Sequence, residues 1–283
     1  MGCRRGSAAQ SLDNNSMPLT AFQKEVMAVL AGNRSESSHV AGGLVLNAPE
    51  DSARYSRDFD FFHEAVEDLV ASSLKDLMAL QSAGFEVTKV ERDGEWSKPV
   101  SFRKASVIRG SEKVELDWAQ DSAFRFFPIV QDDLLGWRLH LFDMATNKAL
   151  ALSARMETRD YVDMVELTRH FPLEAIVWAA CGKDPGFNPL SLFKMMIRFA
   201  RIDPAKLEEI QARKLDPVAL KEEWITVSDS AREEMTQLAD ENPNMPIGVA
   251  FVDDRGHPGW IRSDPSLKIH YPSLRGCWPT MII

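Results

Sequence analysis

The stretch that decides the fold is RYSRDFDFF, at residues 54–62. Within it Phe59 and Phe61 alternate with Asp58 and Asp60, which is the period of a β-strand with one apolar and one polar face. Two carboxylates on one strand face can hold a divalent cation. Mg²⁺ prefers oxygen ligands and usually takes one or two carboxylates, with water and phosphate completing its shell. The stretch therefore predicts a core strand that presents a metal site.

A second acidic strand is predicted at residues 113–118, where Glu115 and Asp117 alternate with apolar residues. We expect Asp117 to be the third metal ligand and keep Glu115 as the alternative. Three converging carboxylates repel one another unless a cation lies among them. An isolated Asp-x-Asp pair is common in a chain with 42 acidic residues, so the surrounding motifs decide its meaning.

The rest of the N-terminal half combines helices and strands. A helix is expected to begin at Thr20, which has capping-box spacing to Gln23. An amphipathic helix is expected over residues 64–83 and ends at Gly84. The strands are predicted at residues 57–62, 85–90, 100–108 and 113–118, and the last three form an antiparallel meander.

The period becomes helical from residue 143, and prolines divide the region into several helices. Residues 243–283 are rich in Pro, Gly and aromatic residues and match no element. We therefore expect an α+β fold in which a short mixed sheet flanked by helices precedes a mainly helical C-terminal module. The expected parts are a disordered lead-in (1–18), a core (19–142), and the helical module with its irregular tail (143–283).

The composition is that of an ordinary globular chain of 283 residues. Its net charge of −9 argues against a surface coated in positive charge for non-specific nucleic-acid binding. Three widely spaced cysteines suggest no disulfide framework and favour a reducing compartment. No signal peptide and no run of about eighteen apolar residues is present, so we expect a soluble, cytoplasmic protein with no membrane partner.

A glycine pair, Gly42-Gly43, follows an expected short strand and precedes the acidic string. Glycines between a strand and a helix allow phosphate oxygens to approach backbone N–H groups. An isolated Gly-Gly dipeptide more often marks a plain turn. Its place ahead of the string Arg-x-Ser-x-Asp-x-Asp makes a phosphate site the stronger interpretation.

These motifs resemble the nucleotidyltransferases of the AbiEii/AbiGii toxin family. The similarity lies in AGGLVLN (41–47) with RYSRDFDFF (54–62), and in LFDMATNKALALSARMETRDYVDM (141–164). The order of elements extends it over roughly residues 20–180. The resemblance implies a polymerase-β-like minimal nucleotidyltransferase fold. It also implies a toxin of a toxin–antitoxin or phage-defence system, held inactive by a separate antitoxin, and some relatives add nucleotides to the 3′ end of tRNA.

The resemblance implies roles for individual residues. Asp58 and Asp60, with Asp117, would bind Mg²⁺ or Mn²⁺ together with the nucleoside triphosphate. The triphosphate would contact four groups that lie near these strands: Gly42, Gly43, Arg54 and Ser56. A surface ion pair is an equally good interpretation of Arg54.

The downstream string supplies a lysine and an aspartate. Lys148 is expected to reach the β- and γ-phosphates as a point charge. Lys148→Ala should then lower transfer more than about tenfold with little change in stability. Asp160 would orient Lys148 or Arg159, accept a proton from the acceptor hydroxyl, or anchor its helix. Asp163 is interpreted as structural.

The acceptor is the least determined part. RNA would suit the excess of basic residues between Lys194 and Lys221, where seven basic and four acidic residues lie, although a mixed-charge helix surface is the commoner cause. Two other functions stay open: nucleotidyl transfer to a protein hydroxyl, as in AMPylation, and a catalytically silent nucleotide-binding module.

Overall fold

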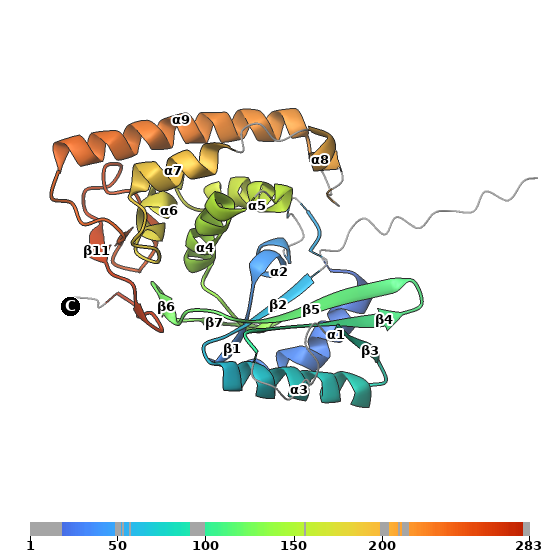
Figure 1. Cartoon of the computed structure of the whole chain (residues 1–283). Coiled ribbons are helices and arrows are strands. Elements are labelled where there is room, and N and C mark those ends of the chain that lie inside the picture. Colours follow the sequence, from blue (N-terminus) through green and yellow to red (C-terminus); the bar gives the residue numbers. More distant parts are fainter. Residues whose placement is uncertain are drawn as a thin grey trace, which may run out of the picture.

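A computed structural model describes residues 19–48, 52, 54–56, 58–90, 100–155, 157–198, 204–208, 210 and 215–279. The expected lead-in over residues 1–18 lies outside these ranges. Two halves lie one above the other in Figure 1. We call them the sheet half (residues 19–140) and the helical half (residues 141–279).

A mixed sheet of seven strands forms the sheet half, in the order β3-β4-β5-β2-β1-β8-β7. The strands are β1 (Ser38–Ala41), β2 (Asp58–His63), β3 (Glu86–Val90), β4 (Phe102–Arg109), β5 (Glu112–Gln120), β7 (Val130–Asp132) and β8 (Gly136–Arg138). The predicted meander is confirmed, because β3, β4 and β5 pair antiparallel. β2 pairs parallel with β5 and antiparallel with β1.

Two helices cover the apolar face of this sheet, α1 (Ala21–Ala31) and α3 (Val66–Ser82) (Figure 1). The alternation in β2 is confirmed: Phe59 and Phe61 are fully buried, while Asp58 and Asp60, which alternate with them, lie on the other face. The capping box of Thr20 and Gln23 is present at the start of α1. Packing of these apolar side chains leaves the opposite, acidic face of the sheet to form a site.

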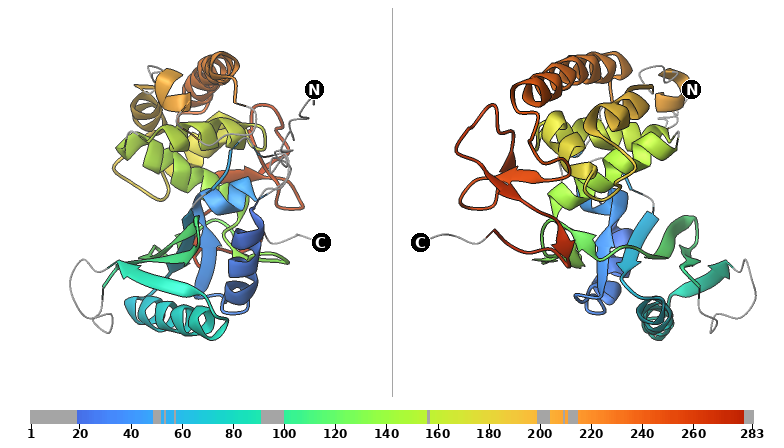
Figure 2. Two further views of the ribbon diagram at one scale, coloured as in Figure 1. Left: turned by 90° about the vertical axis from the view of Figure 1, so that its right-hand side faces the viewer. Right: turned by 60° about the vertical axis from the view of Figure 1, so that its left-hand side comes forward.

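The helical half contains α4 (Leu141–Ala154), α5 (Thr158–Thr168), α6 (Leu173–Ala180), α7 (Pro189–Ile197), α8 (Pro204–Glu208) and α9 (Pro217–Glu241). The two views of Figure 2 show these helices stacked over the sheet half. The α+β class, with a mixed sheet flanked by helices and a mainly helical second part, is confirmed.

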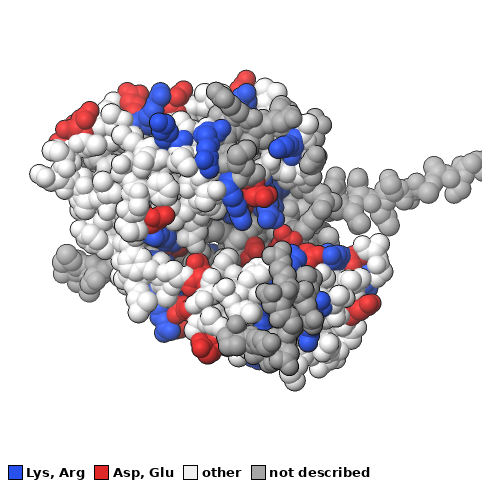
Figure 3. Space-filling view, viewed as in Figure 1, with Lys and Arg blue, Asp and Glu red and all other residues white. Residues whose placement is uncertain are grey.

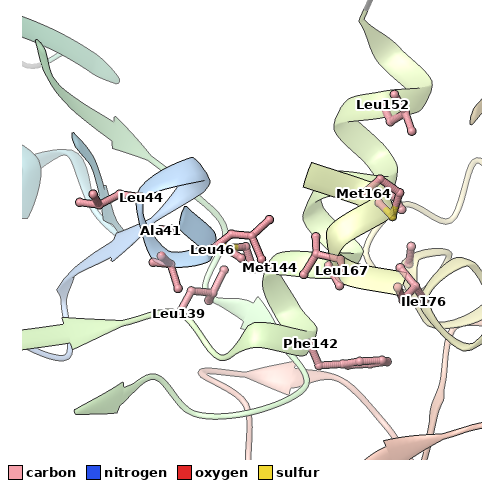
Figure 4. Close-up of a cluster of buried hydrophobic side chains, with 14 of the residues drawn as sticks. Ala41, Leu44, Leu46, Leu139, Phe142, Met144, Leu152, Met164, Leu167 and Ile176 are labelled. Carbon is pink, nitrogen blue, oxygen red and sulfur yellow. The ribbon is translucent and has the colours of Figure 1, made fainter. Parts of the chain in front are cut away.

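One hydrophobic cluster runs through both halves. The short helix α2 (Gly42–Asn47) brings Leu46 toward Met144 and Leu167 of the helical half (Figure 4). Burial of these side chains fixes α2 between the sheet and α4, where its first residues reach the acidic face. The boundary between residues 142 and 143 stays a prediction.

The C-terminal tail, which the sequence left unassigned, contains short strands. β9 (Ala250–Val252), β10 (Pro258–Gly259) and β11 (Lys268–His270) form a small antiparallel sheet. β12 (Ser273–Leu274) pairs with β6 (Phe124–Arg125) of the sheet half. The tail therefore links the two halves. Among the helices described, none has the length and apolar character needed to span a membrane.

Candidate active site

The parallel pairing of β2 with β5 brings the predicted carboxylates together. In this register Asp60 is the partner of Asp117, and Asp58 is the partner of Glu115. Paired residues of neighbouring strands lie about 4.8 Å apart and point to the same face. The three predicted metal ligands therefore share one surface, with Glu115 at its margin.

A cavity of about 860 Å³ lies over this surface. Eight of the predicted site residues line it: Gly42, Gly43, Arg54, Ser56, Asp58, Asp60, Asp117 and Lys148. Asp160 does not line the cavity and is completely buried behind it. Figure 3 shows acidic and basic side chains gathered around the hollow between the two halves.

The glycine pair makes room for the site. Gly42 has a φ of +68°, and a Cβ at this position would overlap the carboxylate of Asp60. A Cβ at Gly43 would press on the guanidinium of Arg54, with Ser56 next to it. The bend between β1 and α2 thus lets side chains from two other segments pack directly against the backbone, as glycine permits.

Behind the cavity lies a buried network of charges. Asp163 accepts hydrogen bonds from Nε and Nη2 of Arg54, at 2.6 and 2.7 Å. Lys148 Nζ lies 2.7 Å from Asp160 and 2.9 Å from Asp163. Arg155 donates to the other oxygen of Asp160 at 2.7 Å. The network ties α4 and α5 to the segment that precedes β2.

This network changes the interpretation of two basic residues. Arg54 is only 6% exposed, and its Nε and Nη2 both donate to Asp163. It is therefore not a surface ion pair, and only part of its side chain faces the cavity. Lys148 is only 8% exposed, so it is not a solvated lysine on a helix surface. Asp163, interpreted as structural, is the residue that joins the two.

The pKa values of the network favour its charged state. Burial alone would raise the pKa of Asp163, but Lys148 and Arg54 outweigh burial and hold it well below its usual range. Burial alone would lower the pKa of Lys148, but the charges of Asp163 and Asp160 outweigh burial and raise it. The lysine therefore stays a cation at the cavity wall.

Asp60 has the opposite environment. Burial first, and then the charge of Asp117, raise the pKa of Asp60 to about 6. Within the described part of the chain, no group donates a hydrogen bond to this carboxylate. Burial, helped by Asp58 and Glu115, also raises the pKa of Asp117, against the opposing effect of Lys104. A cation at this place would relieve both carboxylates.

The residues fit a hard divalent cation by donor type and charge. Two of these carboxylates contact protein cations: Arg159 lies 2.9 Å from Asp58, and Lys104 lies 3.2 Å from Asp117. Across the residues that the structure places, no three carboxylate, imidazole or thiol side chains converge as a finished ligand set. Metal binding would therefore exchange these two ion pairs for oxygen–metal contacts.

The structure also adds residues to the cavity wall for which the sequence predicted no role at the site. They include Tyr55, Phe62, Phe102, Ala119, Asp121, Asn147, Arg155 and Arg159, of which Arg159 was named only as a neighbour of Asp160. Phe62 lies on a predicted strand, and Ala119 lies one residue beyond the strand predicted at 113–118, which the structure extends to Gln120. Both continue the alternation of the acidic face with core residues, which was the available signal. For Arg155 the sequence offers no signal.

No protein-family model matches the chain, and no curated protein matches it. Among solved structures it is similar to a candidate nucleotidyltransferase from H. pylori, with 15% identity, a TM-score of 0.47, and 77% of this chain and 97% of that chain covered. It is also similar to JHP933 from Helicobacter pylori, with 14% identity, a TM-score of 0.44, and coverage of 77% and 94%.

A third similar structure is MenT4, a nucleotidyltransferase toxin from Mycobacterium tuberculosis H37Rv. The identity is 13%, the TM-score is 0.48, and 75% of this chain and 82% of that chain are covered. These are similarities at low identity and low TM-score. The function of the chain is therefore proposed on its own residues.

Proposed function

We propose that the chain is a metal-dependent nucleotidyltransferase that moves a nucleotide from a nucleoside triphosphate to an acceptor hydroxyl and releases pyrophosphate. The observation that supports this most is the parallel register that sets Asp60 beside Asp117 in a large cavity. Asp58 belongs to the same face, and the buried cation Lys148 lies in the same wall. Anionic groups that need a cation, next to a fixed protein cation, suit a metal-bound triphosphate.

Asp58, Asp60 and Asp117 would hold the ion, Mg²⁺ or Mn²⁺, which supplies charge neutralisation at the transferring phosphate. The protein's own contribution is positioning. Lys148 is held by Asp160 and Asp163 as a point charge whose place does not depend on the substrate. Such preorganised charge costs little reorganisation during the reaction.

Arg155 and Arg159 add positive charge at the rim. Their side chains are 52% and 45% exposed, so each can turn toward an incoming anion. Arg159 would lose its partner when Asp58 binds a metal ion and could then contact the triphosphate. The rim and the buried lysine together complement the charge of the nucleotide.

We further propose that the acceptor is the 3′ end of tRNA and that the chain acts as a toxin controlled by a partner antitoxin. The support is the likeness of the two motif strings, residues 41–62 and 141–164, to the toxin family. Transfer to a protein hydroxyl would use the same nucleotide site, because only the acceptor surface differs.

The test is an incubation of the purified chain with each α-labelled NTP, Mg²⁺ or Mn²⁺, and either total bacterial RNA or total bacterial protein. We expect label in the RNA fraction, concentrated in tRNA, and none when EDTA replaces the metal. Label in protein alone would support the AMPylation-like alternative. Failure to label either fraction with a folded chain would leave only nucleotide binding and would overturn the proposal.

A further inference from the structure

The acidic face of the sheet continues into an apolar row. Phe102 is the strand partner of Ala119, and Ala119 is the partner of Phe62. The row lies two residues along the strands from Asp117 and Asp60, so all five side chains point to the same face. All of them line the same cavity.

This row is open. Phe102 is 42% exposed, and among the described residues no aromatic ring packs against it. Phe62 is partly buried, whereas its neighbour Phe61 on the other face is fully buried. An exposed phenylalanine inside a charged cavity is costly unless something apolar covers it, because its apolar surface stays in water.

The shape of the row suits a flat ring. Three neighbouring strands spaced about 4.8 Å apart place the two phenylalanines about 10 Å from each other, with the small Ala119 between them. Aromatic side chains on an open sheet face stack nucleobases without regard to sequence, because every base has a flat apolar face. A nucleobase would fill the space over Ala119 and contact Phe102.

The position of the row relative to the charged residues indicates whether it binds the base of the incoming nucleotide or the base of the acceptor. The sheet order β4-β5-β2-β1 puts Phe102 on one side of the carboxylates, and the glycine pair after β1 on the other. Lys148 lies on the glycine side, because Asp163 pairs with both Lys148 and Arg54, and Arg54 packs beside Gly43. In a displacement at phosphorus the attacking and leaving oxygens lie in line on opposite sides. If pyrophosphate leaves on the glycine side, the attacking hydroxyl arrives from the side of Phe102.

We propose that Phe102, Ala119 and Phe62 form a platform on which the last nucleobase of an RNA acceptor stacks. The inference rests on the proposed nucleotidyl transfer. Adjacent rows of a strand face are about 6.6 Å apart, a distance that one nucleoside spans between its base and its 3′-hydroxyl. The acceptor oxygen would attack the α-phosphorus as the bond to the pyrophosphate oxygen breaks, and the hydroxyl proton would pass to a carboxylate of the acidic face. A serine or threonine hydroxyl of a protein acceptor would bring no flat ring to this row.

The test compares two fluorescein-labelled RNA oligomers that differ only at the 3′-terminal nucleotide, which has its base in one and is abasic in the other. We expect the wild-type chain to bind the natural end about tenfold more tightly. Phe102→Ala should abolish this preference, and Phe102→Tyr should keep it. The matched control is Phe124→Ala on β6, because Phe124 is 41% exposed and does not line the cavity.

Each contrary outcome is distinct. Equal dissociation constants for the two oligomers in the wild type, or no binding of either, would overturn the platform, as would a preference that survives Phe102→Ala. If Phe102→Ala weakens NTP binding and leaves RNA binding unchanged, the base belongs to the incoming nucleotide and the acceptor assignment is wrong. Label transfer by the wild-type chain to total RNA or protein is scored separately. The platform can therefore fail while the proposed function stands.

Discussion

The carboxylate of Asp60 is in an environment that disfavours its charge. It is half-buried between Asp117 and the backbone of Gly42, and no described group donates a hydrogen bond to it. Residues that bind a metal or a substrate are often unfavourable for stability until the ligand is present. Asp60 should therefore cost stability in the metal-free chain.

A pH dependence follows from this cost. The pKa of Asp60 is about 6 in the folded chain, against an ordinary value of 3.8. Between these values the folded chain binds the proton more strongly than the unfolded chain, so the free energy of unfolding falls as pH rises from about 4 to about 6. In EDTA at pH 8, Asp60→Asn should raise the free energy of unfolding by up to about 3 kcal/mol.

Urea unfolding at pH 4 and pH 8 checks this prediction. The increase in the free energy of unfolding on Asp60→Asn should be clear at pH 8. It should be much smaller at pH 4, where Asp60 of the folded wild type is already protonated. Asp133→Asn, on an exposed turn, serves as the control and should show no such difference. If Asp60→Asn raises the free energy of unfolding equally at both pH values, the charged form of Asp60 is not disfavoured in the folded chain.

The burial of Lys148 revises the expectation for its removal. A solvated helix lysine could be removed without loss of stability, but Lys148→Ala leaves Asp160 and Asp163 with only one cationic partner each. Breaking a buried ion pair from one side typically costs about 3–5 kcal/mol. We now expect Lys148→Ala to lower the free energy of unfolding by about 3 kcal/mol and to lower transfer more than about tenfold.

The control for this prediction is Lys75→Ala, since Lys75 is exposed on α3. Both variants are measured by urea unfolding, and transfer is assayed at a temperature where circular dichroism shows each chain folded. If the two lysines behave alike in stability, the buried network does not depend on Lys148. If they behave alike in transfer, Lys148 has no part in the reaction.

At the scale of elements, the junction of β1 and α2 decides how closely the glycine pair approaches the acidic face. Gly42→Ala adds two costs: the backbone cost of a positive φ, about 1–2 kcal/mol, and an overlap with the carboxylate of Asp60. Gly110 has a φ of +60° and no heavy atom within 4 Å of an added Cβ. Gly110→Ala therefore carries the first cost without the second.

We expect both alanine variants to lose stability and only Gly42→Ala to lose transfer, by at least about tenfold. Unfolding in urea and a transfer assay on the two variants separate these effects. Similar losses of activity in Gly42→Ala and Gly110→Ala would show that the glycine junction matters only through general stability.

The sequence predicts the helices and strands whose pattern of apolar and polar residues, or whose capping residues, can be seen within one segment. β2 and β5 alternate cleanly, α1 has its capping box, and α3 has an apolar stripe that Gly84 follows. β7 and β8 have three residues each, which is too short for an alternation to appear. The strands of the tail are equally short, which explains why it matched no element.

The sequence indicated most of the candidate residues that the structure brings together at the cavity, but not the contacts between them. Asp58 and Asp60 share a face by strand geometry alone. Their meeting with Asp117 depends on parallel pairing of β2 with β5, which no local pattern encodes. The same holds for the pairing of Arg54 with Asp163, because it joins segments distant in sequence and is formed only by tertiary packing.

At the scale of the whole molecule, the cavity exists because the two halves are held face to face. The cluster around Leu46 and Met144 joins them near the site, and β12 joins them at the tail. Arg275 beside β12 also pairs with Glu64 of the sheet half, at 2.8 Å. The carboxylates of one half and the cations of the other thus face the same space.

The proposed toxin role predicts an effect on cells. Production of the chain alone in a bacterium should slow growth, and Asp60→Asn at the same soluble level should not, because it lacks a metal ligand. Growth curves with immunoblots of the soluble fraction provide the measurement. Normal growth at high levels of intact wild-type protein would argue against the toxin role while leaving nucleotidyl transfer open.

The most direct test of the central claim is pyrophosphate release, with transfer of label to RNA, by wild type, Asp58→Asn, Asp60→Asn and the control Asp133→Asn. We predict metal-dependent release by wild type and by the control. Each site variant should show a loss of at least about a hundredfold, as for other electrostatic groups in active sites, although Asp60→Asn stays folded and gains stability. Near-normal release by folded Asp60→Asn would contradict the claim that the carboxylates of β2 and β5 form the catalytic centre.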